Sequence, residues 1–64
     1  MTDAERLAGL TFHGPQMVNG EIWCFLFTDP LTGSTFGVAP NETIGAAFRK
    51  WKAEWERAAR VGAA

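Results

Sequence analysis

The sequence has few of the residues on which secreted proteins and metalloproteins depend. Its 64 residues include a single cysteine, Cys24, so no disulfide can form within the chain. A small secreted chain more typically carries paired cysteines. Cys24 and the single histidine, His13, are also too few for a zinc site with the usual four ligands. We therefore expect a reducing, cytoplasmic setting, with no metal and no other cofactor.

Long apolar runs and central basic residues are also missing. No run approaches the roughly 18 apolar residues of a membrane span, and the N-terminus lacks the basic start and apolar body of a signal peptide. No lysine or arginine occurs between Arg6 and Arg49, whereas Glu21, Asp29 and Glu42 lie in that interval. With a net charge of −1, composition favours neither nucleic acid nor a membrane as partner. No motif indicates a small-molecule substrate.

The stretch from Glu21 to Thr28 organises the rest of the chain. Six consecutive large or apolar residues stand between two polar ends, a pattern too short for a helix and typical of a strand. Alternate side chains of a strand point to opposite faces. One face carries Trp23, Phe25 and Phe27, and the other carries Ile22, Cys24 and Leu26. Two apolar faces predict a central strand.

Turn residues delimit two neighbouring strands. Asn19-Gly20 predicts a type I′ hairpin turn, and the run from Asp29 to Gly33 predicts the next reversal. Gly14-Pro15 interrupts the first strand, because proline cannot donate to a sheet, and this indicates an edge strand with a bulge. We expect an α+β fold in one small domain over residues 1–64. It comprises a short helix over 2–9, a three-stranded antiparallel meander over 10–39 and a helix over 41–61.

Both helices have terminal signals. Thr2 and Glu5 have the spacing of a capping box, and Gly9 supplies a stop. Asn41 is the predicted N-cap of the second helix. Its apolar positions recur every three or four residues: Ile44, Ala47, Phe48, Trp51, Trp55 and Ala58. This stripe predicts an amphipathic helix of about 30 Å, long enough to cover one face of the sheet but not both.

The predicted register pairs Phe27 with Phe36, Phe25 with Val38 and Leu26 with Gly37. The expected core face collects Trp23, Phe25, Phe27, Phe36, Val38, Phe12 and Val18 against Phe48, Trp51 and Trp55. The opposite face is apolar and shallow, and we predict that it binds a partner through Met17, Ile22, Cys24, Leu26, Thr35 and Gly37. In the alternative, the N-terminal helix covers that face through Leu7 and Leu10.

No constellation points to an enzyme. Cys24 and His13 form the one nucleophile–base pair by residue type, but Cys24 lies in mid-strand and no third residue is placed to orient a base. The sequence predicts no catalytic residues. We expect a protein-binding module of accessory, regulatory or inhibitory type, which forms a homodimer or docks on a larger protein.

A second reading comes from a resemblance. The run Asp29-Pro30-Leu31-Thr32-Gly33, with Phe36 and a following helix, resembles the second hairpin of the arm-type DNA-binding domains of phage integrases. That resemblance implies three strands, one helix and DNA binding, for which Arg49, Arg57 and Arg60 are a possible basic patch. Those domains read DNA with a basic sheet, which this chain lacks, so we expect no nucleic-acid partner.

Overall fold

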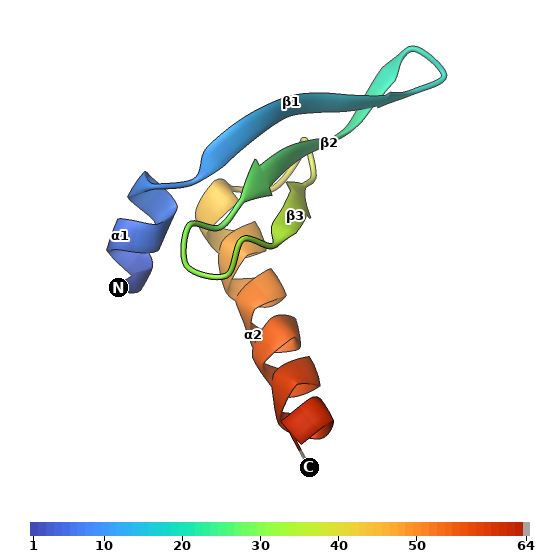
Figure 1. Ribbon diagram of the computed structural model, residues 1–64. Helices are drawn as coiled ribbons and strands as arrows, with labels where there is room; N and C mark the ends of the chain where they lie inside the picture. The colour runs from blue at the N-terminus through green and yellow to red at the C-terminus, as the bar shows by residue number, and fades with distance from the viewer. Residues whose placement is uncertain (64) are drawn as a thin grey trace.

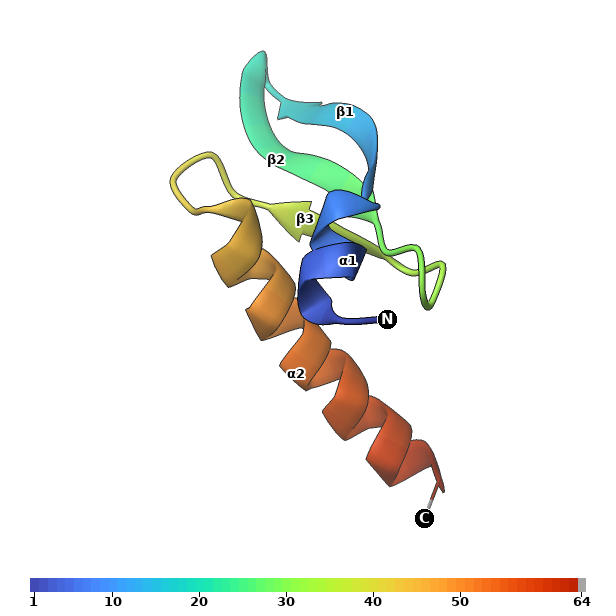
Figure 2. The same ribbon diagram turned by 90° about the vertical axis from the view of Figure 1, so that its left-hand side faces the viewer.

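The chain forms a three-stranded sheet flanked by two helices. The computed structural model describes residues 1–63 and contains α1 (Asp3–Ala8), β1 (Thr11–Val18), β2 (Glu21–Thr28), β3 (Thr35–Val38) and α2 (Ile44–Ala63) (Figure 1). The strands are antiparallel in the order β1-β2-β3, which confirms the α+β fold and the central place of β2. Both helices lie on the same side of the sheet (Figure 2). None of the described helices is long and apolar enough to span a membrane.

The two predicted turns are confirmed by backbone geometry. Asn19 and Gly20 have φ angles of 52° and 81°, as a type I′ turn requires. In the second turn Gly33 has φ 73°, and its N–H donates to the Asp29 carbonyl oxygen at 2.9 Å. Glycine reaches this left-handed conformation without a Cβ penalty, so the two loops reverse the chain tightly.

Irregularities in β1 shape the hairpin. A register shift between Phe12 and Gly14, where Gly14 has φ 97°, confirms the expected bulge. A second shift between Gln16 and Met17 was not predicted, and it leaves Trp23 of β2 without a residue directly opposite. Bulges increase the local twist of a hairpin. The long β1–β2 hairpin is accordingly bent along its length in both views (Figures 1 and 2).

The core lies between β3 and the first half of α2. The predicted pairs Phe27–Phe36, Phe25–Val38 and Leu26–Gly37 are all present. The buried cluster comprises Phe36, Val38, Ala47 and Phe48, with Leu7, Leu10, Phe25, Phe27 and Trp51 packed against it. The rings of Phe36 and Trp51 stack with centroids 5.0 Å apart. This confirms the phase predicted for the helix stripe between residues 47 and 51.

The start of α2 differs from the prediction. The Thr43 hydroxyl accepts a hydrogen bond from the Ala46 N–H at 3.1 Å, and the Ala47 N–H donates to the Thr43 carbonyl oxygen. Thr43 is therefore the cap, and Asn41 is not. The residues before it close a separate turn, in which the Glu42 carboxylate accepts from the Ala39 N–H at 2.9 Å.

The molecule is extended for its size. Its radius of gyration is 12.7 Å, whereas a compact domain of this length would have about 11 Å. Its accessible surface of 4452 Å² exceeds the roughly 4,000 Å² expected from its mass. Figure 1 shows why: the β1–β2 hairpin and the second half of α2 project from the core in different directions.

Candidate functional site

The surface predicted to bind a partner is open. Met17 is 55 % exposed and Ile22 44 %, Leu26 is half-buried, and Thr35 and Gly37 are exposed. We call these residues, with Cys24, the open sheet face. Neither described helix covers it, because α1 and α2 both pack on the opposite face.

The alternative cover for this face is wrong. Leu7 and Leu10 were the residues by which the N-terminal helix could have hidden it. Both pack against the buried cluster that contains Phe36 and Phe48, on the other side of the sheet. The sequence left this choice open because the apolar side of α1 could pack on either face of the sheet.

Cys24 lies in the middle of β2, as predicted, but it is less accessible than Met17 and Ile22. Its side chain is buried, with 9 % exposure, so it is not offered to a partner. A Cβ atom added at Gly37 would lie 3.3 Å from the Cys24 sulfur. The absence of a side chain at Gly37 therefore leaves space for the thiol, and Cys24 packs against the neighbouring strand as a small apolar residue.

One end of the open sheet face is polar. The Thr28 hydroxyl lies 3.0 Å from the Thr35 hydroxyl, and His13 Nε2 also hydrogen-bonds to Thr28. His13 is thus paired with a hydroxyl and not with the Cys24 thiol. Thr35 consequently marks the boundary of the apolar part of the face.

Part of the other face is also exposed, which corrects the predicted core. Trp23 is 67 % exposed, Phe12 55 %, Val18 52 % and Trp55 41 %, although all four were expected in the core. The cause is that α2 packs on β3 and leaves β1 and the outer half of β2 uncovered. There the Phe12 ring lies beside those of Phe25 and Phe27, with centroids 6.4 and 5.1 Å away.

This uncovered region contains a groove of about 440 Å³. We call it the helix-side groove. It is lined by Phe12, Phe25, Phe27, Val38, Ala39, Pro40, Glu42 and Ile44. Glu42 is the one charged residue in that lining, so the groove is an apolar depression with an acidic rim.

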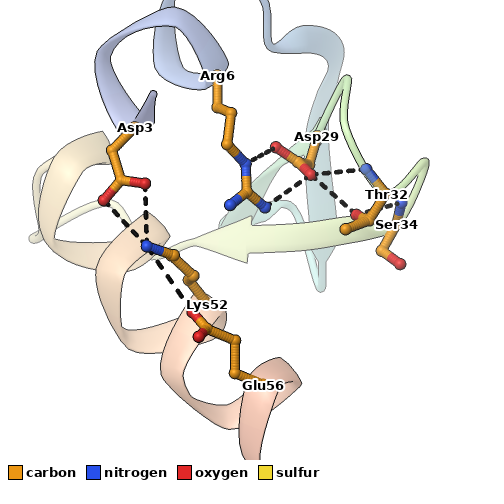
Figure 3. Close-up of polar contacts among 7 residues, drawn as sticks. All are labelled: Asp3, Arg6, Asp29, Thr32, Ser34, Lys52 and Glu56. Carbon is orange, nitrogen blue, oxygen red and sulfur yellow. Dashed lines mark hydrogen bonds and ion pairs between the residues drawn. The ribbon is translucent and has the colours of Figure 1, made fainter. Parts of the chain in front are cut away.

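A buried ion pair holds α1 to the second turn, and sequence reasoning missed it. Arg6 and Asp29 are 6 % and 0 % exposed. Arg6 Nε and Nη2 donate to the two Asp29 carboxylate oxygens at 3.0 and 2.9 Å, and the Thr32 N–H and hydroxyl also donate to Asp29 (Figure 3). The guanidinium lies 5.1 Å from the centre of the Phe48 ring. Both Asp29 carboxylate oxygens therefore accept hydrogen bonds, and no buried side-chain nitrogen or oxygen among the described residues lacks a partner.

Electrostatics of the pair follow from this geometry. The hydrogen bond from Arg6, which is the largest cause, and the hydrogen bonds from Thr32 together lower the pKa of Asp29 to about 2, against the opposing effect of burial. The same hydrogen bond raises the pKa of Arg6. A signal was present in the sequence: Arg6 is the only basic residue before Arg49, so any buried carboxylate in that region had one available counter-ion.

A second, exposed link joins the helices. Lys52 Nζ lies 3.0 Å from an Asp3 carboxylate oxygen and 3.7 Å from Glu56 (Figure 3). Together with the Arg6–Asp29 pair it positions α1 beside α2. The short helix thus docks mainly through polar contacts, with Leu7 as its apolar anchor.

The possible basic patch lies away from both apolar surfaces. Arg49, Arg57 and Arg60 are exposed along α2, at spacings that place them on one side of the helix. No ion pair involves them among the residues that the structure describes. In that same part of the chain no three potential metal ligands are grouped.

Comparison of the chain with known protein families, with curated proteins and with solved structures gave no match.

Proposed function

We propose that this protein is a protein-binding module whose contact surface is the open sheet face. The observation that supports it is the exposure of Met17 and Ile22 on a face that neither α1 nor α2 covers. A contiguous apolar patch on a small domain is characteristic of an interface. Its size suits an accessory, regulatory or inhibitory subunit, and the lone buried thiol suits a cytoplasmic setting.

The chemistry of the face favours a protein over a charged ligand. Its six residues carry no charge, so a partner would approach without desolvating an ion. Gly37 lacks a side chain and Cys24 lies below the surface, which leaves a low centre between Leu26 and Thr35. Burying an apolar side chain fully is worth about 1.5–3 kcal/mol. Met17, Ile22 and Leu26 together can therefore support a specific contact.

Site-specific photocrosslinking tests this proposal. A photoreactive phenylalanine analogue replaces Ile22 in one protein and Ala53 in a control, because Ala53 is exposed on α2 away from the sheet. In the cells that make the protein, we expect an adduct of defined mass from position 22 and none from position 53. Adding Leu26→Asp should remove the adduct. Equal labelling from both positions, or an adduct that survives Leu26→Asp, would contradict the proposal.

DNA binding is the competing function, and no observation of the structure favours it. The sheet presents no lysine or arginine, so few phosphate contacts are available. We expect no appreciable affinity for duplex or single-stranded DNA at physiological salt. Submicromolar binding that disappears when Arg49, Arg57 and Arg60 are neutralised together would reverse this ranking.

A further inference from the structure

We infer that the outer edge of β3 receives an extended segment of another protein as a fourth strand of the sheet. The segment carries an apolar side chain at its centre and basic residues near both ends. The inference goes beyond the proposed function, because it concerns backbone groups at the sheet edge and does not depend on what binds the open sheet face. It rests on the direction of those groups, on a groove beside them and on the charges around that groove.

The backbone of β3 directs two of its residues away from the sheet. The Asp29 N–H donates to the Ser34 carbonyl oxygen at 2.9 Å, in the same register as the pairs between β2 and β3. Backbone groups of successive residues in an antiparallel strand face opposite sides, so the even-numbered residues of β3 face β2. The N–H and C=O groups of Thr35 and Gly37 consequently face outward, where β3 is the last strand in the order β1-β2-β3.

The residue after β3 agrees with this direction. By the same alternation the backbone groups of Ala39 face outward, and both are bonded to Glu42. The Ala39 N–H donates to the Glu42 carboxylate at 2.9 Å, and its carbonyl oxygen accepts from the Glu42 N–H at 3.1 Å. This turn therefore closes one end of the edge. It leaves the backbone groups of Thr35 and Gly37, two exposed residues, for an added strand.

The other edge of the sheet is less suited to an added strand. Pro15 lies in β1 and has no N–H to donate. Register shifts on either side of it, after Phe12 and after Gln16, increase the twist of that strand. Bulges and proline are common means by which proteins protect an edge strand from further pairing. The four residues of β3 include neither, so the accessible edge is on that side.

A groove of about 240 Å³ lies beside the open edge, between β3 and α2. We call it the edge groove. Phe36 and Gly37 line it from β3, and α2 contributes Ala47, Lys50, Trp51 and Glu54. Residues directly opposite each other in an antiparallel pair have their side chains on the same face of the sheet. The residue of an added strand opposite Phe36 therefore points toward this groove, where the stacked rings of Phe36 and Trp51 favour an apolar side chain.

Charge around the edge groove favours basic residues in the added segment. Its lining holds two carboxylates, Glu42 and Glu54, and one lysine, Lys50, a net −1. Among the residues that the structure describes, no ion pair involves either of these two glutamates. Side chains two residues before and after the central one lie on the same face of a strand. Basic residues at those positions thus approach the two carboxylates.

The position of α2 favours a single segment over a second copy of the sheet. This helix packs on β3 (Figure 1), and an antiparallel pair of β3 strands would put two such helices on one side of a continuous sheet. Neighbouring strands are about 4.8 Å apart, whereas packed helices need about 8–10 Å. The two helices would collide. An extended segment brings no helix with it, so it meets no such obstacle.

Titration with a synthetic peptide tests the inference. The probe is acetyl-Lys-Thr-Val-Thr-Lys-amide, whose valine is placed opposite Phe36 and whose threonines pair with Thr35 and Gly37. In isotope-labelled protein observed by NMR, we expect saturable binding at or below about 1 mM. The amides of Thr35 and Gly37 should shift, and should exchange with solvent at least tenfold more slowly than in the free protein. A probe that leaves both amides unchanged at several millimolar would overturn the inference.

A backbone-methylated probe is the matched control. N-methylation of both threonines removes two backbone donors of the probe and keeps its side chains and charge. We expect at least tenfold weaker binding, because the hydrogen bonds to the carbonyl oxygens of Thr35 and Gly37 are lost. Equal affinity of the two peptides would refute the strand pairing.

Charge variants at exposed positions of α2 locate the contact. Glu54→Lys should weaken binding of the probe about fivefold, and Lys50→Glu should strengthen it by a similar factor. Glu56→Lys makes the same change of charge on another side of the helix and should leave binding unchanged. Circular dichroism should show an intact helix in all three variants. Equal weakening by Glu54→Lys and Glu56→Lys would mean general charge attraction and would overturn the assignment to the edge groove.

A variant on the open sheet face separates this inference from the proposed function. Ile22→Asp should leave the probe bound at the edge of β3. Loss of binding in Ile22→Asp, with no effect of Glu54→Lys, would overturn the inference and agree with the proposed function. An absent photocrosslink at position 22 would instead contradict the proposed function and leave binding at the edge unaffected. A dimer of the parent that protects the Thr35 and Gly37 amides without any peptide would overturn the inference in favour of a second copy.

Discussion

The base of the molecule and the tip of its hairpin are built from similar residues and behave differently. At the base, where α1, the Asp29 turn and the first half of α2 meet, Phe48 and Asp29 are completely enclosed. At the tip, Val18, Ile22 and Trp23 are between 44 and 67 % exposed. The tip is just as apolar, but β3 and α2 do not extend beneath it. Coverage by a neighbouring element, and not hydrophobicity, decides which apolar residues become core.

Burial and apolar exposure are thereby concentrated in different regions of the molecule. The base concentrates the contacts that oppose unfolding, whereas the tip keeps apolar surface that is available to another molecule. Substitutions at the two regions should therefore have very different effects on unfolding.

Phe48→Ala should give the largest effect. The ring is fully buried against Phe36, Trp51 and the Arg6 guanidinium. Truncating such a ring costs about 3–5 kcal/mol, which is a large part of the stability of a small domain. Urea denaturation followed by circular dichroism measures the loss. Trp23→Ala, at the exposed tip, is the control and should change stability by no more than about 0.5 kcal/mol. Similar losses from the two variants would contradict the division.

Asp29→Ala should cause the second largest loss of stability. It leaves the Arg6 charge buried without its partner, which costs about 3 kcal/mol or more. Asp3→Ala removes the exposed partner of Lys52 and should cost about 0.5 kcal/mol. Adding Arg6→Met to Asp29→Ala should recover part of the loss, because no unpaired charge then remains. Unfolding free energies of Asp29→Ala, Arg6→Met and the double variant from chemical denaturation give the coupling free energy of the pair.

Acid should destabilise the region where α1, the Asp29 turn and α2 meet, because it protonates Asp29 of the same ion pair. The pKa of Asp29 is about 2 in the folded protein and 3.8 for the ordinary group, so ionised Asp29 stabilises the fold above about pH 4. As the pH falls toward 2 the carboxylate gains a proton and about 2 kcal/mol is lost. Thermal unfolding between pH 5 and 2 should show a steeper decline for the parent than for Asp29→Asn. Equal slopes would mean that the pair does not govern acid sensitivity.

Gly20→Ala should give a smaller effect, confined to the tip. Gly20 has φ 81°, and an added Cβ would meet no atom within 4 Å. The cost is therefore one of backbone conformation alone, about 1 kcal/mol. Gly62→Ala in α2 also meets nothing within 4 Å, and there alanine should be neutral or slightly stabilising. Chemical denaturation of both variants separates backbone strain from crowding.

Local sequence patterns predicted the helices, strands and turns of this fold well. They did not predict which apolar side chains another element covers. The capping box of Thr2 and Glu5, the Asn19-Gly20 turn and the pairing of Phe27 with Phe36 each depend on near neighbours in the chain, and all are confirmed. Trp23 was misplaced because alternation tells which face a side chain is on. It does not tell whether another element reaches that far.

The exposure of the residues proposed to bind a partner was predicted for some of them and not for others. Met17 and Ile22 are exposed as expected, because the faces of β2 follow from its period of two. Cys24 was not, since its burial depends on Gly37 in a different strand. The Arg6–Asp29 pair joins residues 23 positions apart. Arg6 is the only lysine or arginine before Arg49, but the spacing of charges does not indicate which carboxylate it meets.

The Arg6–Asp29 pair also has a consequence for the order in which the elements assemble during folding. Burying the Asp29 carboxylate without a counter-ion is strongly unfavourable. Its turn therefore closes fully only when α1 brings Arg6 next to it. Arg6 in turn needs the Phe48 ring already in place beneath it. The β1–β2 hairpin and the β3–α2 contact should therefore assemble first, with α1 added as the final step. In the transition state for folding, Leu7→Ala should accordingly give a φ-value near zero, and Phe36→Leu a substantially higher one.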